Sequence, residues 1–333
     1  MPVTLKDVAQ RAGVSRSAVS RTFTEGASVS PKTRAKVERA AADLGYAPSA
    51  LASALSTGRT KLIGLVVSNF HNPLFLEVFD RFTTGLQARG LRPLLVNLTG
   101  ETDPEASVRM LRQYSVDGVI VASSTLPPSF AGAFRKAGLP VVHSFGRWTA
   151  APETHVVGID NRECGRLAAR TLIERGYRRV AFLGGPEAAT STEDRLAGFL
   201  DGLTDAPVPG VMTSFAQGYT FEAGRAEMQR LIAAGPPADA YFCGDDVLSI
   251  GALSALREAG FSVPGDVGLI GLNDMQIAGW QNIDLTTIRQ PVNAIIDASI
   301  ELALATIEDP DRLPEARLFA CHIVERGTLR PIS

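Results

Sequence analysis

The sequence predicts an α/β protein in which a small helical N-terminal domain precedes a larger body of parallel β-sheets. Three observations support this fold class. The first 46 residues contain three short amphipathic segments with capping residues at their ends. Residues 61–333 alternate short apolar runs with helix-length segments, which is typical of parallel sheets covered by helices. The basic residues are also concentrated near the N-terminus.

Composition restricts the class of protein. The chain has 333 residues, of which 45% are hydrophobic and 20% are charged, as in soluble globular proteins of two or three domains. No apolar run reaches the ~18 residues that a membrane-spanning helix needs, and the first residues lack the apolar segment of a secretory signal. Three widely spaced cysteines indicate neither a disulfide framework nor a zinc ribbon. We therefore expect a cytoplasmic protein with no membrane partner.

Charge is distributed unevenly along the chain. The formal net charge is −2, yet residues 1–61 carry +6 and the remaining residues carry −8. A small basic domain attached to an acidic body is typical of proteins that bind nucleic acid. A solvated helical surface would have the same balance, so the spacing of residues must decide between the two interpretations.

The first sixty residues predict three helices. Thr4 can cap a helix that ends at Gly13, and Ser15 can cap a second helix directly after it. Two helices joined by so short a turn form a helix-turn-helix. Ser30, followed by Pro31, can cap a third helix that ends at Gly45.

The second of these helices has a polar face. The apolar side chains of Val19 and Phe23 share one side, which leaves Arg16, Ser17, Ser20 and Arg21 on the others. An exposed helix fits the major groove of DNA, where arginine bonds guanine and serine bonds several base edges. The alternative is a small helical bundle whose surface is merely basic.

The segment LKDVAQRAGVSRSAVSRTF, with the following VSPKTRAKVERAAADLGYAP, resembles the headpiece of the lac-repressor/galactose-repressor (LacI/GalR) family of transcription regulators. The resemblance implies that Arg16 and Ser17 discriminate between operators and that Ser20 and Arg21 contact backbone and base. The other residues of the predicted DNA-binding set are Leu5, Ser15, Thr24, Ser30 and Thr33. For Ser30, a role as a helix cap alone is an equal alternative.

Residues 47–60 follow the headpiece, which we place at residues 1–46. Alone, this alanine-rich stretch reads as a weakly helical linker. The resemblance implies a hinge helix that forms on the operator, where two copies pack in the minor groove and Leu55 inserts between central base pairs. The alternative is a passive tether in which Leu55 is simply buried.

The body, residues 61–333, contains predicted strands separated by predicted helices. The strands are residues 62–67, 94–96, 118–122, 140–143, 180–184, 240–243 and 267–272, with a further strand in RLFACHIVERG. The helices are residues 73–89, 104–114, 161–175, 193–203, 218–234, 246–259 and 291–307. So many strands predict two sheets, and ligands bind beyond the carboxyl ends of such strands.

The body resembles the effector-binding core of the same family, which is similar to periplasmic sugar-binding proteins. The resemblance implies an N-lobe of about residues 61–159 plus 290–317 and a C-lobe of about 160–289 plus 318–330. The chain would then cross between lobes near residues 160, 290 and 318. A ligand would bind in the crevice between them.

Polar residues that follow the predicted strands are candidates for effector binding. They are Ser68, Asn69, Phe70, Arg195, Tyr219, Asp245 and Asn273, a set that suits a small polar ligand such as a sugar. By resemblance, Arg195 matches the effector-binding arginine and Tyr219 a stacking aromatic. Asp245 and Asn273 occupy positions that are usually asparagine and aspartate. A surface ion pair is the alternative role for Arg195. Asp246 and Asp274, which directly follow Asp245 and Asn273, can bind the effector or merely cap a helix.

Enzyme classes find no support in the sequence. Motifs of P-loop, zinc-protease, serine-hydrolase and kinase type do not occur, and the four histidines lack metal-ligand spacing. Cys243 lies in a predicted strand and reads as a core thiol. We therefore expect no catalysis, no cofactor and no metal. A binding protein or enzyme with an incidental helical N-terminus remains the rival hypothesis.

The expected mode of DNA binding predicts the oligomeric state. One headpiece reads only half of a pseudo-palindromic site in double-stranded operator DNA, so two-fold symmetry is expected. The apolar segment 291–307 belongs either to the core or to an interface, and no heptad-bearing helix follows RLFACHIVERG. The sequence thus predicts a homodimeric repressor controlled by a small-molecule effector.

Overall fold

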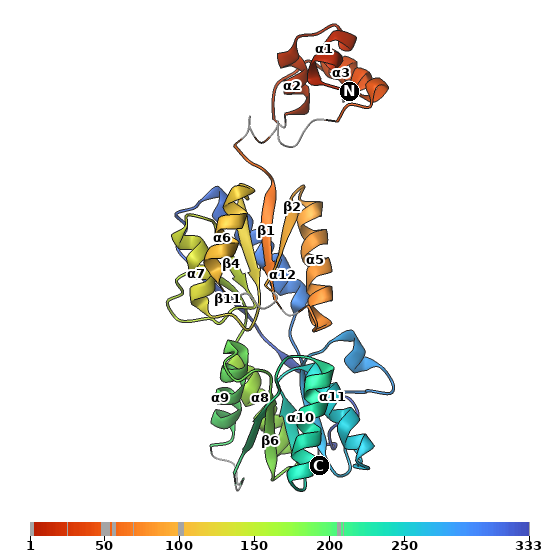
Figure 1. Ribbon diagram of the computed structural model, residues 1–333, viewed down its shortest axis with the longest axis vertical. Helices are drawn as coiled ribbons and strands as arrows, with labels where there is room; N and C mark the ends of the chain where they lie inside the picture. Colours follow the sequence, from red (N-terminus) through yellow and green to blue (C-terminus); the bar gives the residue numbers. More distant parts are fainter. Residues whose placement is uncertain are drawn as a thin grey trace. The chain divides into compact units, whose positions relative to one another are not determined.

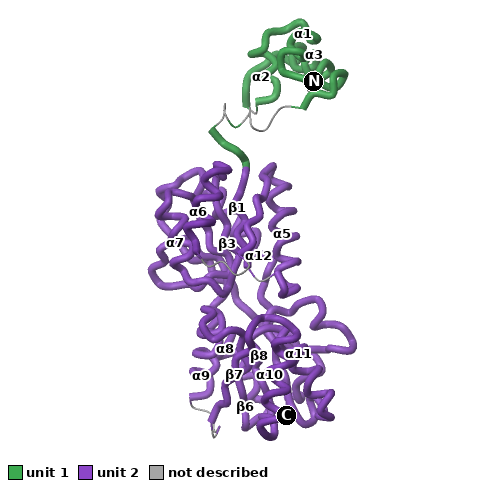
Figure 2. The backbone as a smooth tube through the Cα atoms, in the orientation of Figure 1, with its two compact units in different colours: residues 1–61 green, residues 62–333 purple. Residues whose placement is uncertain are grey.

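The computed structural model describes residues 3–24, 26–47, 54, 58–68, 70–98, 103–204, 208 and 210–332. The backbone forms two compact units, residues 1–61 and residues 62–333 (Figure 2). The described helices of the first unit form a small bundle, and all described strands lie in the second (Figure 1). This is the predicted fold class.

The first unit contains α1 (Leu5–Ala12), α2 (Arg16–Phe23) and α3 (Pro31–Leu44). Val8, Val19 and Val37, one from each helix, are fully buried and form its core with neighbouring alanines. The apolar spacing along each segment brings these side chains to one side of their helix, which is why three short helices can share so small a core.

Local hydrogen bonds set the helix ends in this unit. The Asp7 carboxylate accepts hydrogen bonds from the backbone nitrogen of Thr4 (2.8 Å) and from its hydroxyl (2.7 Å). Gly13 has φ +65°, a left-handed conformation that favours glycine, and it ends α1. Ser15 Oγ accepts from Ala18 N (3.2 Å) and so begins α2 two residues later. These caps produce the tight turn of the predicted helix-turn-helix.

The second unit contains two six-stranded sheets. In the N-lobe sheet the order is β11-β5-β4-β3-β1-β2, and every pairing is parallel. The strands are β1 (Leu62–Val67), β2 (Arg92–Asn97), β3 (Gly118–Ala122), β4 (Val141–Ser144), β5 (His155–Ile159) and β11 (Ala316–Phe319).

In the C-lobe sheet the order is β12-β10-β9-β8-β6-β7, and only β12 runs antiparallel to its neighbour. The strands are β6 (Val180–Gly184), β7 (Met212–Phe215), β8 (Ala240–Cys243), β9 (Gly268–Asn273), β10 (Thr287–Arg289) and β12 (His322–Val324). In both sheets the central strands are buried on both faces, as parallel strands between helices must be.

Helices flank both sheets (Figure 1). They are α5 (Leu74–Ala88), α6 (Pro104–Gln113), α7 (Pro128–Lys136), α8 (Asn161–Glu174), α9 (Thr190–Gly202), α10 (Phe221–Ala234), α11 (Asp246–Glu258) and α12 (Val292–Glu308), with a short 3₁₀ turn at Gln276–Gly279. Helix α12 packs on the N-lobe sheet, while α8 pairs with α9 and α10 with α11. Among the described helices, none is long and apolar enough to cross a membrane.

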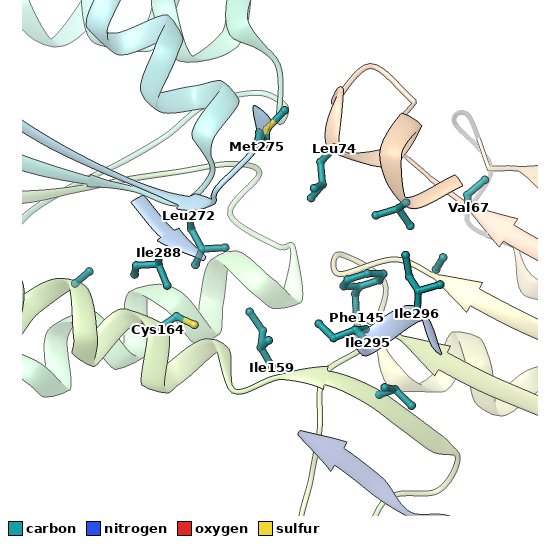
Figure 3. Close-up of a cluster of buried hydrophobic side chains, with 14 of the residues drawn as sticks. Val67, Leu74, Phe145, Ile159, Cys164, Leu272, Met275, Ile288, Ile295 and Ile296 are labelled. Carbon is teal, nitrogen blue, oxygen red and sulfur yellow. The ribbon is translucent and has the colours of Figure 1, made fainter. Parts of the chain in front are cut away.

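Within the described residues, the chain passes between the lobes three times. It crosses between β5 and α8, between β10 and α12, and between β11 and β12. The third crossing falls between Phe319 and His322, where we expected one near residue 318. One apolar cluster spans the crossings, with Phe145 and Ile295 of the N-lobe and Leu272 and Ile288 of the C-lobe (Figure 3). The lobes therefore share buried surface at the hinge.

The secondary structure differs from the prediction in a few places. Strands β5, β7 and β10 and helix α7 were not predicted, because these segments are short or lack a clear apolar period. The single strand expected in RLFACHIVERG is wrong. That segment forms β11 and β12, which belong to different sheets and are separated at Ala320 and Cys321.

Candidate functional site

Helix α2 presents a polar face at the surface of the first unit. Val19 and Thr22 are buried against the other helices, while the side chains of Arg16, Ser17, Ser20 and Arg21 are exposed. Arg21 Nε lies 3.4 Å from the carbonyl oxygen of Ser17, to which it donates. The helix therefore offers hydrogen-bond donors and hydroxyls on a rigid scaffold, as base readout in a major groove requires.

The remaining predicted DNA contacts have local structural partners. Ser30 Oγ accepts from Thr33 N (3.2 Å) and caps α3, and Thr24 Oγ1 donates to the carbonyl of Ser20 (2.9 Å). Leu5 is half-buried against the core of the bundle. Capping by Ser30 is thus observed, and DNA contact by these side chains stays a prediction. The predicted wedge, Leu55, lies outside the described residues.

A cavity of about 580 Å³ opens between the two lobes of the second unit. Its walls come from segments that follow parallel strands: Ser68 after β1, Thr125 and Leu126 after β3, and Pro186 after β6, with Tyr219 before α10. Ser68 and Tyr219 are predicted site residues. The cavity lies where ligands bind in open α/β sheets, beyond the carboxyl ends of the strands.

Most of the cavity wall is apolar or weakly polar. Phe130 of α7 contributes an aromatic surface, and the Tyr219 hydroxyl is within hydrogen-bond distance of Thr192 Oγ1 (2.6 Å) and Ser191 Oγ (3.2 Å). Phe70 does not line this cavity and packs edge-on against Phe79 instead, with ring centroids 6.3 Å apart. Asn69 lies outside the described residues.

Asp245 is the centre of a buried polar cluster that connects the lobes. Its Oδ2 accepts from Asn72 Nδ2 of the N-lobe (3.0 Å) and from Asn273 Nδ2 of the C-lobe (2.8 Å), and its Oδ1 accepts from Val247 N (2.8 Å). Gln290 Nε2 in turn donates to Asn273 Oδ1 (2.6 Å). The hydrogen bond from Asn72 to Asp245 therefore links one lobe directly to the other.

Arg195 lies on the first turns of α9 and is only 3% exposed. Its Nε donates to Asn161 Oδ1 (2.8 Å) and its Nη1 donates to the Gly244 carbonyl (2.5 Å). The alternative of a surface ion pair for Arg195 is therefore wrong. Burial raises the pKa of Asp245 to about 6, and the hydrogen bond from Val247 and the charge of Arg195 oppose that rise.

The neighbouring carboxylates have different roles. Asp245, not Asp246, caps α11. Asp246 is fully buried and accepts from Met275 N (2.8 Å) and Thr287 Oγ1 (2.5 Å), and burial raises its pKa to about 7. Asp274 forms ion pairs with Arg289 (2.5 Å) and Arg326 (2.6 Å). The expectation that Asp246 or Asp274 caps a helix is therefore wrong.

Sequence reasoning missed three residues of the buried cluster: Asn72, Asn161 and Gln290. Asn161 begins α8, two residues after the end of β5 at the first crossing, and Gln290 directly follows β10. Because those strands were not predicted, the polar residues that follow them were not selected as candidate site residues. Asn72 follows β1, yet nothing in the sequence distinguished it from its neighbours. Within the described ranges, no group of three or more His, Cys, Asp or Glu side chains is arranged to hold a metal ion.

Comparison with known proteins agrees with this geometry. Residues 4–49 match the family described as bacterial regulatory proteins, lacI family, and residues 169–329 match the periplasmic binding protein-like domain. The chain is 32% identical over 340 residues to the HTH-type transcriptional repressor PurR of Vibrio atlanticus (strain LGP32), and the alignment covers 99% of each chain. It is 33% identical over 331 residues to the HTH-type transcriptional regulator CelR of Thermobifida fusca, covering 97% of each.

Solved structures are similar over nearly the whole chain. The lac repressor dimer bound to operator and the anti-inducer ONPF has a TM-score of 0.89 at 26% identity, covering 99% of this chain and 100% of that one. The CelR–cellobiose complex has a TM-score of 0.72 at 31% identity, with 98% and 99% covered. The chain therefore belongs to the lacI family of bacterial regulatory proteins and is a DNA-binding transcriptional regulator.

Proposed function

We propose that this protein is a repressor that binds a pseudo-palindromic operator as a homodimer and changes its operator affinity when a small polar molecule binds between the lobes. In this proposal residues 1–46 read the DNA, residues 47–60 connect, and residues 61–333 bind the effector and dimerise. The observation that carries the proposal is the exposed polar face of α2, formed by Arg16, Ser17, Ser20 and Arg21.

The position of these four side chains supports base readout. They lie on the first two turns of α2, where side chains of a recognition helix reach base edges. An arginine bonded bidentately to guanine contributes about 1–3 kcal/mol of discrimination against another base. A helix that served only to complete the bundle would need no such concentration of arginine and serine on its exposed side.

The cavity supports an uncharged, hydroxyl-bearing effector. Its volume of about 580 Å³ is within the range typical of small-molecule sites. None of the described residues that line it is charged, so a ligand of high net charge would lack a compensating partner in its wall. The solved complex of CelR contains cellobiose, and a sugar or related metabolite is the class that we propose here.

The interlobe hydrogen bond supports coupling between effector and DNA. Asn72 donates to Asp245 across the lobes, and both side chains are buried. A ligand that replaces this bond with its own contacts would change the angle between the lobes, and allosteric coupling energies of about 1–3 kcal/mol are typical. In a dimer such a change would alter the spacing of the two segments 47–60.

The proposal includes no catalytic step and no cofactor. Its partners are double-stranded operator DNA, a second copy of this chain and the effector. Because its target is chromosomal DNA, the site of action would be the cytoplasm. The relatives PurR and CelR are both named as transcription regulators, which supports this assignment.

A gel-shift titration with genomic fragments tests the proposal. The full-length protein should retain a discrete fragment at moderate salt, and Arg21→Ala should lose about 10- to 100-fold in affinity for it, since one arginine–base contact is removed. Arg39→Ala, which removes an exposed arginine from α3, should lose far less. Equal losses in both variants, or no retained fragment at low salt with and without metabolites, would contradict the proposal.

The effector can be found by a melting-shift screen. Residues 62–333 form a compact unit of their own, so the full chain can be screened while the melting of this unit is followed. Sugars, including cellobiose, nucleosides and related metabolites should be tested. A stabilising compound should also alter retention of the operator fragment; a compound that binds without changing retention would argue against an allosteric role.

A further inference from the structure

Two of the three cysteines meet at the hinge between the lobes. Cys164 is on the first turns of α8, directly after the first crossing, and Cys321 lies between β11 and β12, within the third crossing. Cys164 is buried and Cys321 is partly exposed. The third cysteine, Cys243, is buried in the C-lobe sheet and belongs to a different apolar cluster.

Strand register brings the two hinge cysteines together. Strands β5 and β11 run parallel, with Phe319 paired to Ile159 at the edge where both chains leave the N-lobe sheet. Cys321 follows Phe319 by two residues, and Cys164 is on the helix that begins two residues after Ile159. Both side chains pack in the same apolar cluster, where Cys164 lies near Ile159 and Ile288 (Figure 3).

The strand register and the shared cluster place the two thiols close enough to influence each other. The interaction with Cys321 raises the pKa of Cys164, and burial raises it further. The interaction with Cys164 lowers the pKa of Cys321, and the charge of Arg195 lowers it too. The thiolate is the reactive form of cysteine, so the pair combines a partly exposed nucleophile with a buried resolving thiol.

We infer that Cys164 and Cys321 form a reversible disulfide when the protein meets a hydroperoxide, and that this bond fastens the start of α8 to the third interlobe segment. The Cys321 thiolate attacks the terminal oxygen of the hydroperoxide, the O–O bond breaks and Cys321 becomes a sulfenic acid. The leaving group is hydroxide from hydrogen peroxide or an alkoxide from an organic hydroperoxide. The Cys164 sulfur then attacks the Cys321 sulfur, the S–O bond breaks, and water leaves with the Cys164 proton. Two electrons pass from the sulfurs to the peroxide.

The inference does not depend on the proposed function. A cytosolic disulfide is usually transient and serves as a sensor, and one at this place would restrict movement of the lobes whatever the protein regulates. Because the bond would close a long loop of the chain, it should also stabilise the folded unit. The measurements below require neither DNA nor an effector.

The test is thiol mapping of the full-length protein before and after treatment with hydrogen peroxide. Free thiols per chain, titrated after denaturation, should fall from three to one and return to three with dithiothreitol. Trypsin should release Glu163–Arg166 and Leu318–Arg326 as one disulfide-linked pair, since each peptide contains a single cysteine. The oxidised protein should melt at a higher temperature than the reduced protein.

Variants separate the two steps. Cys164→Ser should trap the sulfenic acid at Cys321, where dimedone labels it, whereas Cys321→Ser should leave Cys164 unlabelled. Cys243→Ser is the matched control and should keep the linked peptides. Three free thiols after peroxide, a Cys321–Cys321 link between chains, or overoxidation of Cys321 without a link would each overturn the inference, and mapping of the wild-type chain decides this even if a variant fails to fold.

Discussion

The two units of this protein are built by different kinds of interaction. In residues 1–61 each described candidate contact lies on one helix or at a helix end, and its neighbours in sequence fix its position. In residues 62–333 the candidate effector cavity is lined by segments that follow β1, β3 and β6. The polar cluster that connects the lobes likewise unites Asn72, Asp245 and Gln290 from separate elements. The comparison teaches that a recognition surface can be local while a regulated site cannot, because regulation requires parts that move relative to each other.

The largest effect should be a loss of stability of the second unit when the packing that positions Arg195 is disturbed. In Gly198→Ala the new Cβ would lie 1.9 Å from the carbonyl oxygen of Arg162, so α8 and α9 would have to separate. We expect the second unit to lose on the order of 3 kcal/mol in its free energy of unfolding, measured by urea titration. Hydrogen exchange in α3 should not change.

The matched control is Gly132→Ala in α7, where the nearest atom to the new Cβ is Glu153 Oε2 at 3.9 Å. Alanine is a better helix former than glycine by up to about 1 kcal/mol, so this variant should be neutral or slightly more stable. Destabilisation of both variants to the same extent would show that the close approach of α8 and α9 is not the cause.

The next largest effect should be on the response to effector, when the buried Arg195 is replaced. Arg195→Ala removes charged hydrogen bonds to Asn161 and Gly244, and we expect the response to the screened effector to weaken roughly 10- to 100-fold. Operator affinity without effector should stay near that of the wild type. Arg162→Ala, which removes a half-exposed arginine from α8, is the control. An unchanged ligand titration in Arg195→Ala would remove that residue from the site.

A smaller effect should appear as pH dependence of the second unit. Burial raises the pKa of Asp246 to about 7, above its ordinary value near 4, so the folded state binds its proton more tightly than the unfolded state. Stability should therefore fall as pH rises from about 4 to about 7 and then level off. Asp245 contributes in the same direction up to about pH 6.

Asp246→Asn should remove most of this slope, because its amide cannot ionise and can still bond Met275 and Thr287. Asp309→Asn, at an exposed position, should keep the slope. Urea titrations at a series of pH values measure both variants. Stability that rises between pH 4 and 7 would contradict the assigned direction.

The smallest effect distinguishes a cap from a DNA contact in the first unit. Ser30→Ala should cost about 1 kcal/mol of local stability in α3, seen as faster hydrogen exchange, because Thr33 N loses its acceptor. Ser30→Asn should restore the cap. If operator affinity falls in Ser30→Ala and returns in Ser30→Asn, capping accounts for the role of Ser30; a loss that Asn does not restore would support a direct contact.

Features that local interactions control could be predicted from the sequence. The caps at Ser15 and Ser30, the glycine at 13 and the apolar spacing of three helices specify the helix-turn-helix within about forty residues. The apolar runs of the central strands likewise predicted two parallel sheets, because strands buried on both faces need continuous hydrophobic segments. The spacing of apolar residues along α2 predicted which of its faces is exposed.

Which polar residues meet depends on long-range packing. Short strands such as β10 have too few residues to show a period, so the sequence did not mark Gln290 or Asn161 as residues that follow a strand. The segment RLFACHIVERG was predicted as one strand, although its two strands belong to different sheets. The burial of Arg195 and the proximity of Cys164 and Cys321 depend on chain crossings far apart in sequence. Such contacts result from long-range packing, whose energy no single segment contains.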